Sequence, residues 1–411
     1  MSEILHWVGD RSILLVYAYT LMFSGVVAML LVPWCIKAAR KFNVLDFPDD
    51  RKMHAIPTPL LGGLAMVGAF GITLVVNVLA VRWGIANLSL LQWLPDNMAP
   101  AFEGAMSSER LLQAVVIFGG ALLVAGVGLL DDLYQVRPRY RLMVQIFAAS
   151  MVVAVGVSPD YLGMPYWMSA LLTVGWIVVV TNSFNLIDSL DGLSAGIAVI
   201  CAMTLAATMH FARQPLVATF ALVVAGCALG FLRYNRSPAR IFMGSTGSLF
   251  LGFAVSVAVA LGISITPTQS PLVSVAMPFL ILGVPLYDTL SVVYLRIRAG
   301  QHIFEPDQRH LAHRMMKFGF NHREAVWVVY LMTVVVGATS PMLVRATSGE
   351  TLLLIFQAGC ALALVVALEW GSTKNGFGYT VARQTEDAST NRIGTPPREI
   401  AASQVNITTR T

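Results

Sequence analysis

A polar stretch, TNSFNLIDSLDGL (residues 181–193), separates two apolar runs, residues 167–180 and 193–211. Its amide and carboxylate residues, Asn182, Asn185, Asp188 and Asp191, recur at every third position. On a regular α-helix each step of three residues turns a side chain by about 60°, so neighbouring pairs share a face but all four do not. A 3₁₀ turn or a break in the helix would align them, and Gly192 is the expected place for that break.

The same stretch contains no Lys or Arg. Carboxylates beside a membrane-length apolar run are energetically costly unless a cation neutralises them. We therefore favour a site for a cation or for phosphate chemistry. The alternative is a polar turn at a membrane surface with no further role.

The composition indicates an all-α polytopic membrane protein. Of the 411 residues, 56% are hydrophobic and 12% are charged, whereas about 25% of the residues of a soluble domain are charged. Apolar runs of about 20 residues recur along the chain and predict about 11 transmembrane helices. We expect them near residues 13–36, 61–81, 111–130, 140–157, 167–181, 193–211, 215–234, 248–266, 273–295, 324–345 and 350–370.

The distribution of basic residues predicts the orientation of these spans. With the N-terminus outside, 22 of the 27 Lys and Arg residues fall in the inner loops and the C-terminal tail. The positive-inside rule therefore places the C-terminus in the cytoplasm. We expect residues 1–370 to form one membrane-embedded domain with its polar loops on the cytoplasmic face. Residues 371–411, rich in Thr, Ser, Arg and Pro, are predicted to be a disordered tail.

A pair of acids, Asp131 and Asp132, ends the third apolar run. Adjacent carboxylates raise each other's pKa unless a cation lies between them, so a divalent metal ion is the favoured explanation. The rival explanation is a surface salt-bridge cluster with three nearby arginines, Arg137, Arg139 and Arg141.

Three other inner loops carry polar clusters. The first reads RKMHAIPTPLLGG (residues 51–63). Its cations suit either phosphate binding or the ordinary excess of basic residues in cytoplasmic loops. The second reads YNRSPARIFMGSTGS (residues 234–248) and is by itself a weak signal. The third, PDQRHLAHR (residues 306–314), would as a helix put His310, His313, Arg314 and Lys317 on one cationic face, for a diphosphate or for lipid headgroups. Asp288 lies inside the ninth apolar run and needs a partner or a water-lined cavity.

In this order, the clusters resemble those of the bacterial polyprenyl-phosphate N-acetylhexosamine-1-phosphate transferases, the superfamily of WecA and MraY. The resemblance covers about residues 51–323 and includes the Pro-rich Gly-Gly loop, the Asp-Asp pair, N-x-x-N-x-x-D-x-x-D-G-L, F-M-G-x-x-G-S and the His-containing fifth loop. The segment RKMH (residues 51–54) is similar to the WecA branch. This similarity favours a UDP-N-acetylhexosamine over a UDP-muramoyl-pentapeptide as donor.

The resemblance implies a transferase of the bacterial cytoplasmic (inner) membrane that moves N-acetylhexosamine-1-phosphate, with GlcNAc as the expected sugar. The acceptor would be undecaprenyl phosphate and the by-product UMP, in the first membrane step of a cell-surface polysaccharide. Mg²⁺ is the implied cofactor, with Mn²⁺ as the alternative ion. The implied partners are the two substrates and the lipid bilayer, with a second copy of the chain as a further candidate and no nucleic acid.

By motif match, the resemblance also implies residue roles. The implied catalytic residues are Asp131, Asp132, Asp188, Asp191, His310 and His313. The implied substrate-binding residues are Arg51, His54, Asn182, Asn185, Asn235, Phe242, Arg309 and Arg314, with Phe242 stacking on uracil and Asn235 hydrogen-bonding it. The implied metal ligands are the four aspartates together with Ser245.

The chain departs from the family pattern at three positions. Leu60 replaces the usual Arg, Ala312 replaces a third His, and Ser245 replaces a metal-binding Asp. The last departure leaves an alternative function, a non-catalytic relative that binds lipid-linked sugar or a partner. The retained acid pairs favour the enzyme, because an idle site has no physical need for four unneutralised carboxylates. A secondary transporter would instead show polar positions near mid-membrane and an internal repeat.

Overall fold

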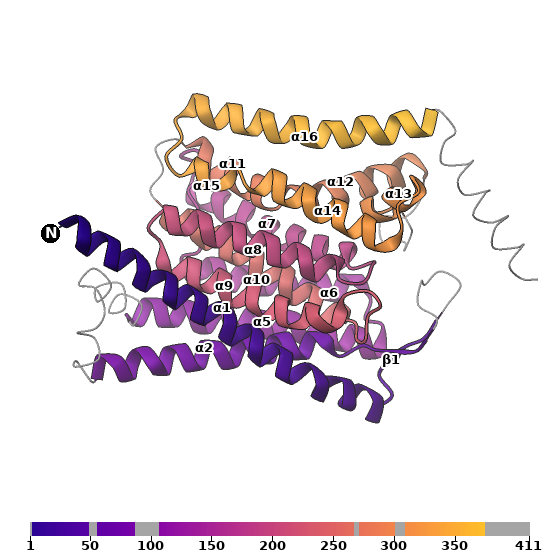
Figure 1. Ribbon diagram of the computed structural model, residues 1–411, viewed down its shortest axis with the longest axis horizontal. Helices are drawn as coiled ribbons and strands as arrows, with labels where there is room; N and C mark the ends of the chain where they lie inside the picture. The colour runs from indigo at the N-terminus through magenta and orange to yellow at the C-terminus, as the bar shows by residue number, and fades with distance from the viewer. Residues whose placement is uncertain (1, 49–55, 87–106, 267–270, 301–308, 375–411) are drawn as a thin grey trace, which may run out of the picture.

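The computed structural model describes residues 2–48, 56–86, 107–266, 271–300 and 309–374 (Figure 1). Within these residues the chain is helical apart from loops and one two-stranded antiparallel ribbon, formed by β1 (Leu45–Asp46) and β2 (Thr58–Pro59). A helix satisfies its backbone hydrogen bonds internally, which apolar segments in lipid require. The all-α class is therefore confirmed.

A helix lies at each of the predicted spans. The long helices of the first half are α1 (Ser2–Lys41), α2 (Gly62–Ala86), α5 (Ser108–Tyr134), α6 (Pro138–Ala154), α7 (Tyr166–Ile187) and α8 (Leu193–Phe211). The helices of the second half, long and short, are α9 (Pro215–Asn235), α10 (Gly244–Ile265), α11 (Leu272–Ile281), α12 (Gly283–Arg298), α13 (Leu311–Lys317), α14 (His322–Gly337), α15 (Ser340–Leu343) and α16 (Ser348–Lys374).

In the described part of the chain, 8 helices are long and apolar enough to cross a membrane, or 9 if a bent pair counts as one span. The expectation of about 11 counted two further helices. These are α6, which has 17 residues, and α16, whose apolar part is Ser348–Leu364. The predicted tail lies, beyond Lys374, outside the described residues.

The predicted ninth span, residues 273–295, is not one helix. It consists of α11 and α12, which are bent by 77° at Leu282. Pro285 has no N–H, so it cannot donate to the carbonyl of Ile281 and continue the helix through the bend. Asp288 therefore lies within the second of these two helices, α12, beyond the bend.

Helix α10 lies at the centre of the molecule, where it packs against α2, α5, α7, α8 and α9. In its 18-residue apolar segment 83% of the residues are buried, compared with 17% in the corresponding segment of α1. Small residues recur at every fourth position of α10, namely Gly244, Ser248, Gly252, Ser256 and Ala260. Such a stripe lets neighbouring backbones approach closely, which is the main source of helix packing in membranes.

Segments from distant parts of the sequence meet at one end of the bundle. In Figure 1 the β1 strand and α13 lie at the same end, and the N-terminus of α1 lies at the opposite end. The residues just before α10 are joined to the first turn of α2 there, because Gly62 and Gly63 donate backbone hydrogen bonds to the carbonyls of Phe242 and Met243 (both 3.0 Å). This end contains the candidate site.

Candidate active site

Asp132 accepts hydrogen bonds from the first turn of α10. Its Oδ1 accepts the Ser245 N–H (2.7 Å), and its Oδ2 accepts both the N–H (3.0 Å) and the hydroxyl (2.6 Å) of Thr246. The first N–H groups of a helix have no partner within the helix and carry a partial positive charge, so a carboxylate is stabilised there. Asp132, at the end of α5, is thereby fixed against the central helix.

Asp131 has different partners from its neighbour. Its Oδ2 accepts the Ser245 hydroxyl (2.6 Å) and pairs with the guanidinium of Arg141 on α6 (2.5 Å). The salt-bridge explanation for this acid pair therefore describes one contact, that between Asp131 and Arg141, and the metal explanation stays a prediction. Ser245 contacts both carboxylates, one through its hydroxyl and the other through its backbone.

The polar stretch that joins α7 to α8 contains a break. Helix α7 ends at Ile187, Asp188 is its C-cap, and Gly192 has the left-handed backbone (φ +79°) from which α8 begins. A left-handed backbone favours glycine because it has no Cβ. The break was predicted at Gly192, and the prediction is confirmed.

The four polar residues of this stretch do not line up on one face. Asn182 donates to Gln145 on α6 (2.5 Å), and Asn185 donates to Ser248 on α10 (2.9 Å). The carboxylate of Asp191 accepts the N–H of Ala239 in the α9–α10 loop (3.0 Å). Because α7 stays regular through Ile187, the two amides brace it against neighbouring helices while the acids occupy the turn.

Asp188 is the least compensated of these acids. Within the described residues, its carboxylate has neither a hydrogen-bond donor nor a cation as a partner, although the side chain is only partly exposed. Burial, followed by the nearby charges of Asp132 and Asp191, raises the pKa of Asp188 to about 8. Desolvation and like charges both disfavour the ionised form. A cation in this position would reverse that preference.

The α9–α10 loop is fixed by a buried amide. Asn235 accepts the Gly192 N–H (3.0 Å) and donates to the Ile241 carbonyl (2.9 Å), so it ties this loop to the α7–α8 turn. Phe242 is half-buried, and its N–H donates to the Pro59 carbonyl (2.8 Å). Arg51 and His54, the two predicted residues that precede β2, lie outside the described residues.

The fifth-loop cluster is organised by Asp288 of α12, which is fully buried. Its carboxylate binds His310 Nδ1 (2.8 Å) and the Leu311 N–H (2.5 Å), with Arg314 at 3.8 Å. The predicted need of this acid for a partner is confirmed. The second contact makes α13 begin after His310, so His310 does not belong to the predicted helical face.

The remaining members of this cluster also contact α12. Arg314 donates to Ser291 (2.7 Å) and Arg309 donates to the Leu295 carbonyl (3.2 Å). Burial, and next the charge of His310, lowers the pKa of His313 to about 4. His313 is therefore neutral at pH 7, and the face of α13 is less cationic than its sequence suggested.

The donor set fits a magnesium ion better than a metal held by protein ligands alone. Within the described residues, no three His, Cys, Asp or Glu side chains gather as a complete ligand set. Mg²⁺ usually binds one or two carboxylates and completes its octahedron with water and phosphate oxygens. Asp131 and Asp132 meet at Ser245, all three offer hard oxygen donors, and the charge of Asp188 lies close by.

Several contributing residues were missed in the sequence. Thr246 binds Asp132, and Gln145 and Ser248 hold the two asparagines. Arg141, which binds Asp131, was predicted as a salt-bridge partner of the acid pair. The four-residue spacing of Gly and Ser in α10 was the available signal for Ser248. Gln145 carried no signal, because one amide in an apolar run has no pattern to identify its partner.

Comparison with known proteins gives an independent result. Residues 114–263 match the model of Glycosyl transferase family 4. A Bacillus subtilis protein named probable undecaprenyl-phosphate N-acetylglucosaminyl 1-phosphate transferase is 35% identical over 355 residues, which cover 84% of this chain and 90% of the relative. A decaprenyl-phosphate N-acetylglucosaminephosphotransferase of Mycobacterium tuberculosis is 31% identical, with coverage of 79% and 82%.

The matched region of the family runs from α5 to α10 and so contains the acid pair, the α7–α8 turn and the first turn of α10. These are the segments whose side chains converge at one end of the bundle. The chain belongs to glycosyl transferase family 4, in the branch that includes WecA-like polyprenyl-phosphate sugar-phosphate transferases.

Proposed function

We propose that this chain is a Mg²⁺-dependent phosphoglycosyl transferase of the bacterial cytoplasmic membrane. It transfers N-acetylglucosamine-1-phosphate from UDP-N-acetylglucosamine to undecaprenyl phosphate, giving undecaprenyl-diphospho-N-acetylglucosamine and UMP. A phosphate oxygen of the lipid forms a bond to the β-phosphorus of the donor, and the bond from that phosphorus to the bridging oxygen breaks. The two relatives described above have names that assign them a transfer of this kind to a polyprenyl phosphate.

One observation carries the proposal: two acids from α5 converge on the first turn of α10 beside an uncompensated acid of the α7–α8 turn. Phosphoryl transfer requires little covalent chemistry from the protein; it needs aligned substrates and cations on the phosphate oxygens. A bound Mg²⁺ would supply that charge. A lipid and a soluble nucleotide can meet only where spans end, which is where these residues lie.

The contacts suggest separate roles within this set. Asp131, Asp132, Asp188, Asp191 and Ser245 would hold the metal ion and the phosphates. Asp131, which has an oxygen outside its contacts with Arg141 and Ser245, is the better placed of the α5 pair to take a proton from the lipid phosphate. Asp132 has fewer free lone pairs, because three donors of α10 already bind it.

The donor-binding residues are proposed on the family resemblance together with their positions. Phe242 would stack on uracil, and Asn235 would position the loop that carries it, since both ends of its amide bind backbone groups. His310, whose other ring nitrogen is free of the Asp288 contact, would touch the diphosphate, with neutral His313 beside it.

The test is release of UMP by purified protein that receives UDP-N-acetylglucosamine, undecaprenyl phosphate and Mg²⁺. We expect UMP, no UDP, and no reaction without the lipid. Asp188→Asn should release UMP about 10² to 10³ times more slowly, whereas Asp160→Asn, which changes an exposed acid between α6 and α7, should match the wild type. Replacing the donor by UDP-N-acetylgalactosamine tests the sugar. A folded wild type that releases no UMP with either donor would favour the non-catalytic alternative, for which Ser245 is the only supporting feature.

A further inference from the structure

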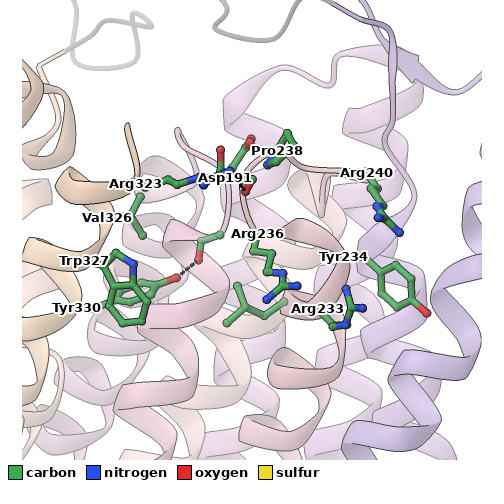
Figure 2. A pocket seen from close by; sticks show the side chains of 13 residues that line it. Asp191, Arg233, Tyr234, Arg236, Pro238, Arg240, Arg323, Val326, Trp327 and Tyr330 are labelled. Atoms are coloured by element: carbon green, nitrogen blue, oxygen red, sulfur yellow. Dashed lines mark hydrogen bonds between the residues drawn. The ribbon is translucent and has the colours of Figure 1, made fainter. Parts of the chain in front are cut away.

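A cavity lies beside the α7–α8 turn, on the side that faces α14. It has a volume of about 650 Å³, within the range of small-molecule sites. Its walls come from the end of α9, the α9–α10 loop and the first half of α14 (Figure 2). Of the four aspartates of the candidate active site, only Asp191 lines it.

The cavity is strongly cationic. Four arginines line it, Arg233, Arg236, Arg240 and Arg323, against the single carboxylate of Asp191. Within the described residues, none of the four forms an ion pair with an acid, and Asp191 binds the Ala239 N–H instead. In the part of the chain that the structure describes, the only side-chain hydrogen bond from these arginines is from Arg323 to the Ser237 carbonyl (3.1 Å).

The position of these charges needs an explanation. The end of α9 accounts for Arg233, because a helix C-terminus stabilises a nearby cation. Arg323 is in the first turn of α14, where the helix dipole disfavours a cation, and Arg240 belongs to neither helix. Gathered around one cavity, these charges stabilise an anion, and guanidinium groups bind phosphate by paired hydrogen bonds.

The lower part of the cavity is apolar and aromatic. Leu232, Val326, Trp327 and Tyr330 line it, and Figure 2 shows Trp327 and Tyr330 on the α14 wall, below Arg323. Helix α9, and α14 together with α15, are long and apolar enough to span a membrane, and Trp327 is 69% exposed. Trp and Tyr rings are typical of the membrane–water interface.

We propose that this cavity binds an anionic phospholipid of the surrounding bilayer. The phosphate headgroup is held by the arginines, and an acyl chain descends over Leu232 and Trp327 into the membrane. The site is distinct from that of the substrate lipid, whose phosphate must reach the acids at the first turn of α10. The cavity adjoins the α7–α8 turn, because the Tyr330 hydroxyl in its wall donates a hydrogen bond to the Gly192 carbonyl (2.6 Å). This inference goes beyond the proposed reaction and does not depend on it.

The experiment is native mass spectrometry of the purified full-length chain with added phosphatidylglycerol. Wild type is compared with Arg233→Gln/Arg236→Gln. The matched control is Arg298→Gln, which removes an exposed cation from the last turn of another helix, α12. We expect one tightly retained phosphatidylglycerol per wild-type chain. Apparent affinity should fall about 25-fold in the double variant, about fivefold for each arginine, and stay within about twofold in the control.

Other ligands decide between the possible phosphate sources. Zwitterionic phosphatidylcholine should be retained much more weakly than phosphatidylglycerol, and millimolar inorganic phosphate should not displace the lipid. Equal loss in Arg298→Gln, displacement by inorganic phosphate, or one-for-one displacement by undecaprenyl phosphate would each overturn the proposal. If the double variant does not fold, Trp327→Ala, which removes an exposed ring, must still weaken retention of phosphatidylglycerol; unchanged retention also overturns it.

Discussion

At the scale of single residues, the acids of the site differ in whether their carboxylates have hydrogen-bond donors as partners. The carboxylate of Asp132 accepts hydrogen bonds from three donors of α10. In an asparagine at this position the NH₂ group would face one or two of these donors and could not accept from them. We expect Asp132→Asn to lose both activity and about 2 kcal/mol of stability, as when a helix cap is removed. Asp188 has no such donors, so Asp188→Asn should lower kcat by about 10² to 10³ without destabilising the fold.

Steady-state UMP release and thermal unfolding of both variants, measured on the same preparations, check this difference. A loss of stability in Asp188→Asn comparable to that of Asp132→Asn would mean that the α7–α8 turn has structural partners of its own. Activity within a few-fold of wild type in both variants would refute the metal and phosphate roles of these acids.

Ser245 makes a second prediction at this scale. Its hydroxyl lies 2.6 Å from Asp131 Oδ2, and its N–H binds Asp132. In Ser245→Asp a third carboxylate would meet these two, so the variant should unfold at a lower temperature than wild type in EDTA and gain more from added Mg²⁺. It should also need less Mg²⁺ for half-maximal rate.

Ser245→Ala is the control, because it removes the hydroxyl without adding charge. Mg²⁺ titrations of UMP release and of the unfolding temperature, on all three proteins, provide the measurement. Identical responses of wild type and Ser245→Asp would place residue 245 away from the metal ion. An inert wild type with an active Ser245→Asp would identify the natural chain as a non-catalytic relative.

At the scale of elements, α10 is the helix on which the site depends. A Cβ at Gly252 would lie 2.7 Å from the Cα of Thr181 on α7, the first residue of the polar stretch. Gly252→Ala must therefore displace α7, and overpacking of this kind costs about 1 to 3 kcal/mol. We expect a lower unfolding temperature together with lower activity.

Gly175→Ala is the matched control on α7, because a Cβ there meets no atom within 4 Å. Alanine favours helix over glycine by up to about 1 kcal/mol, so this variant should be as stable as wild type or more stable. Unfolding temperatures of the two variants test the close packing of α10 against α7. Equal stability of both would show that this contact tolerates a methyl group.

Helix positions were predictable from the sequence because an apolar run in a membrane has only one satisfactory secondary structure. The break at Gly192 was predictable for the same kind of reason, since few residues favour a left-handed backbone. The bend at Leu282 was missed, although the sequence contains Pro278 and Pro285. A proline in an apolar run does not by itself indicate whether the helix kinks or ends there. The start of α13 depends on Asp288, 23 residues away from Leu311, which no local pattern contains.

At the scale of the whole molecule, the bias of basic residues predicts that the α5–α6 connection faces the cytoplasm and the α6–α7 connection faces outward. In a cysteine-free background, Arg139→Cys should react only with membrane-permeant reagents, and Asp160→Cys should react with impermeant ones. Arg139 lies in the first turn of α6, and Asp160 lies in the loop that follows the other end of this helix. Labelling of intact cells gives the answer, and the reverse pattern would invert the topology and put the site outside.

The composition of the candidate site was predictable at this scale, but its internal contacts were not. The sequence placed the polar clusters at one membrane face, and the structure brings together Asp131, Asp132 and Ser245. The pairing of Asn185 with Ser248 joins residues 63 positions apart, and only packed helices determine it. The arginine-lined cavity was also invisible, since no motif connects the α7–α8 turn and the α9–α10 loop with the residues of α14 that complete its wall.

The central claim is that the β-phosphorus of the nucleotide sugar moves to the lipid. The most direct measurement supplies UDP-N-acetylglucosamine labelled with ³²P in the β-phosphate, with undecaprenyl phosphate and Mg²⁺, and then separates lipid from nucleotide. We predict that the label appears in the lipid for wild type and Asp160→Asn, and stays in the nucleotide for Asp188→Asn. Label that remains in released UDP while the sugar enters the lipid, or no labelled lipid from folded wild type, would contradict the account.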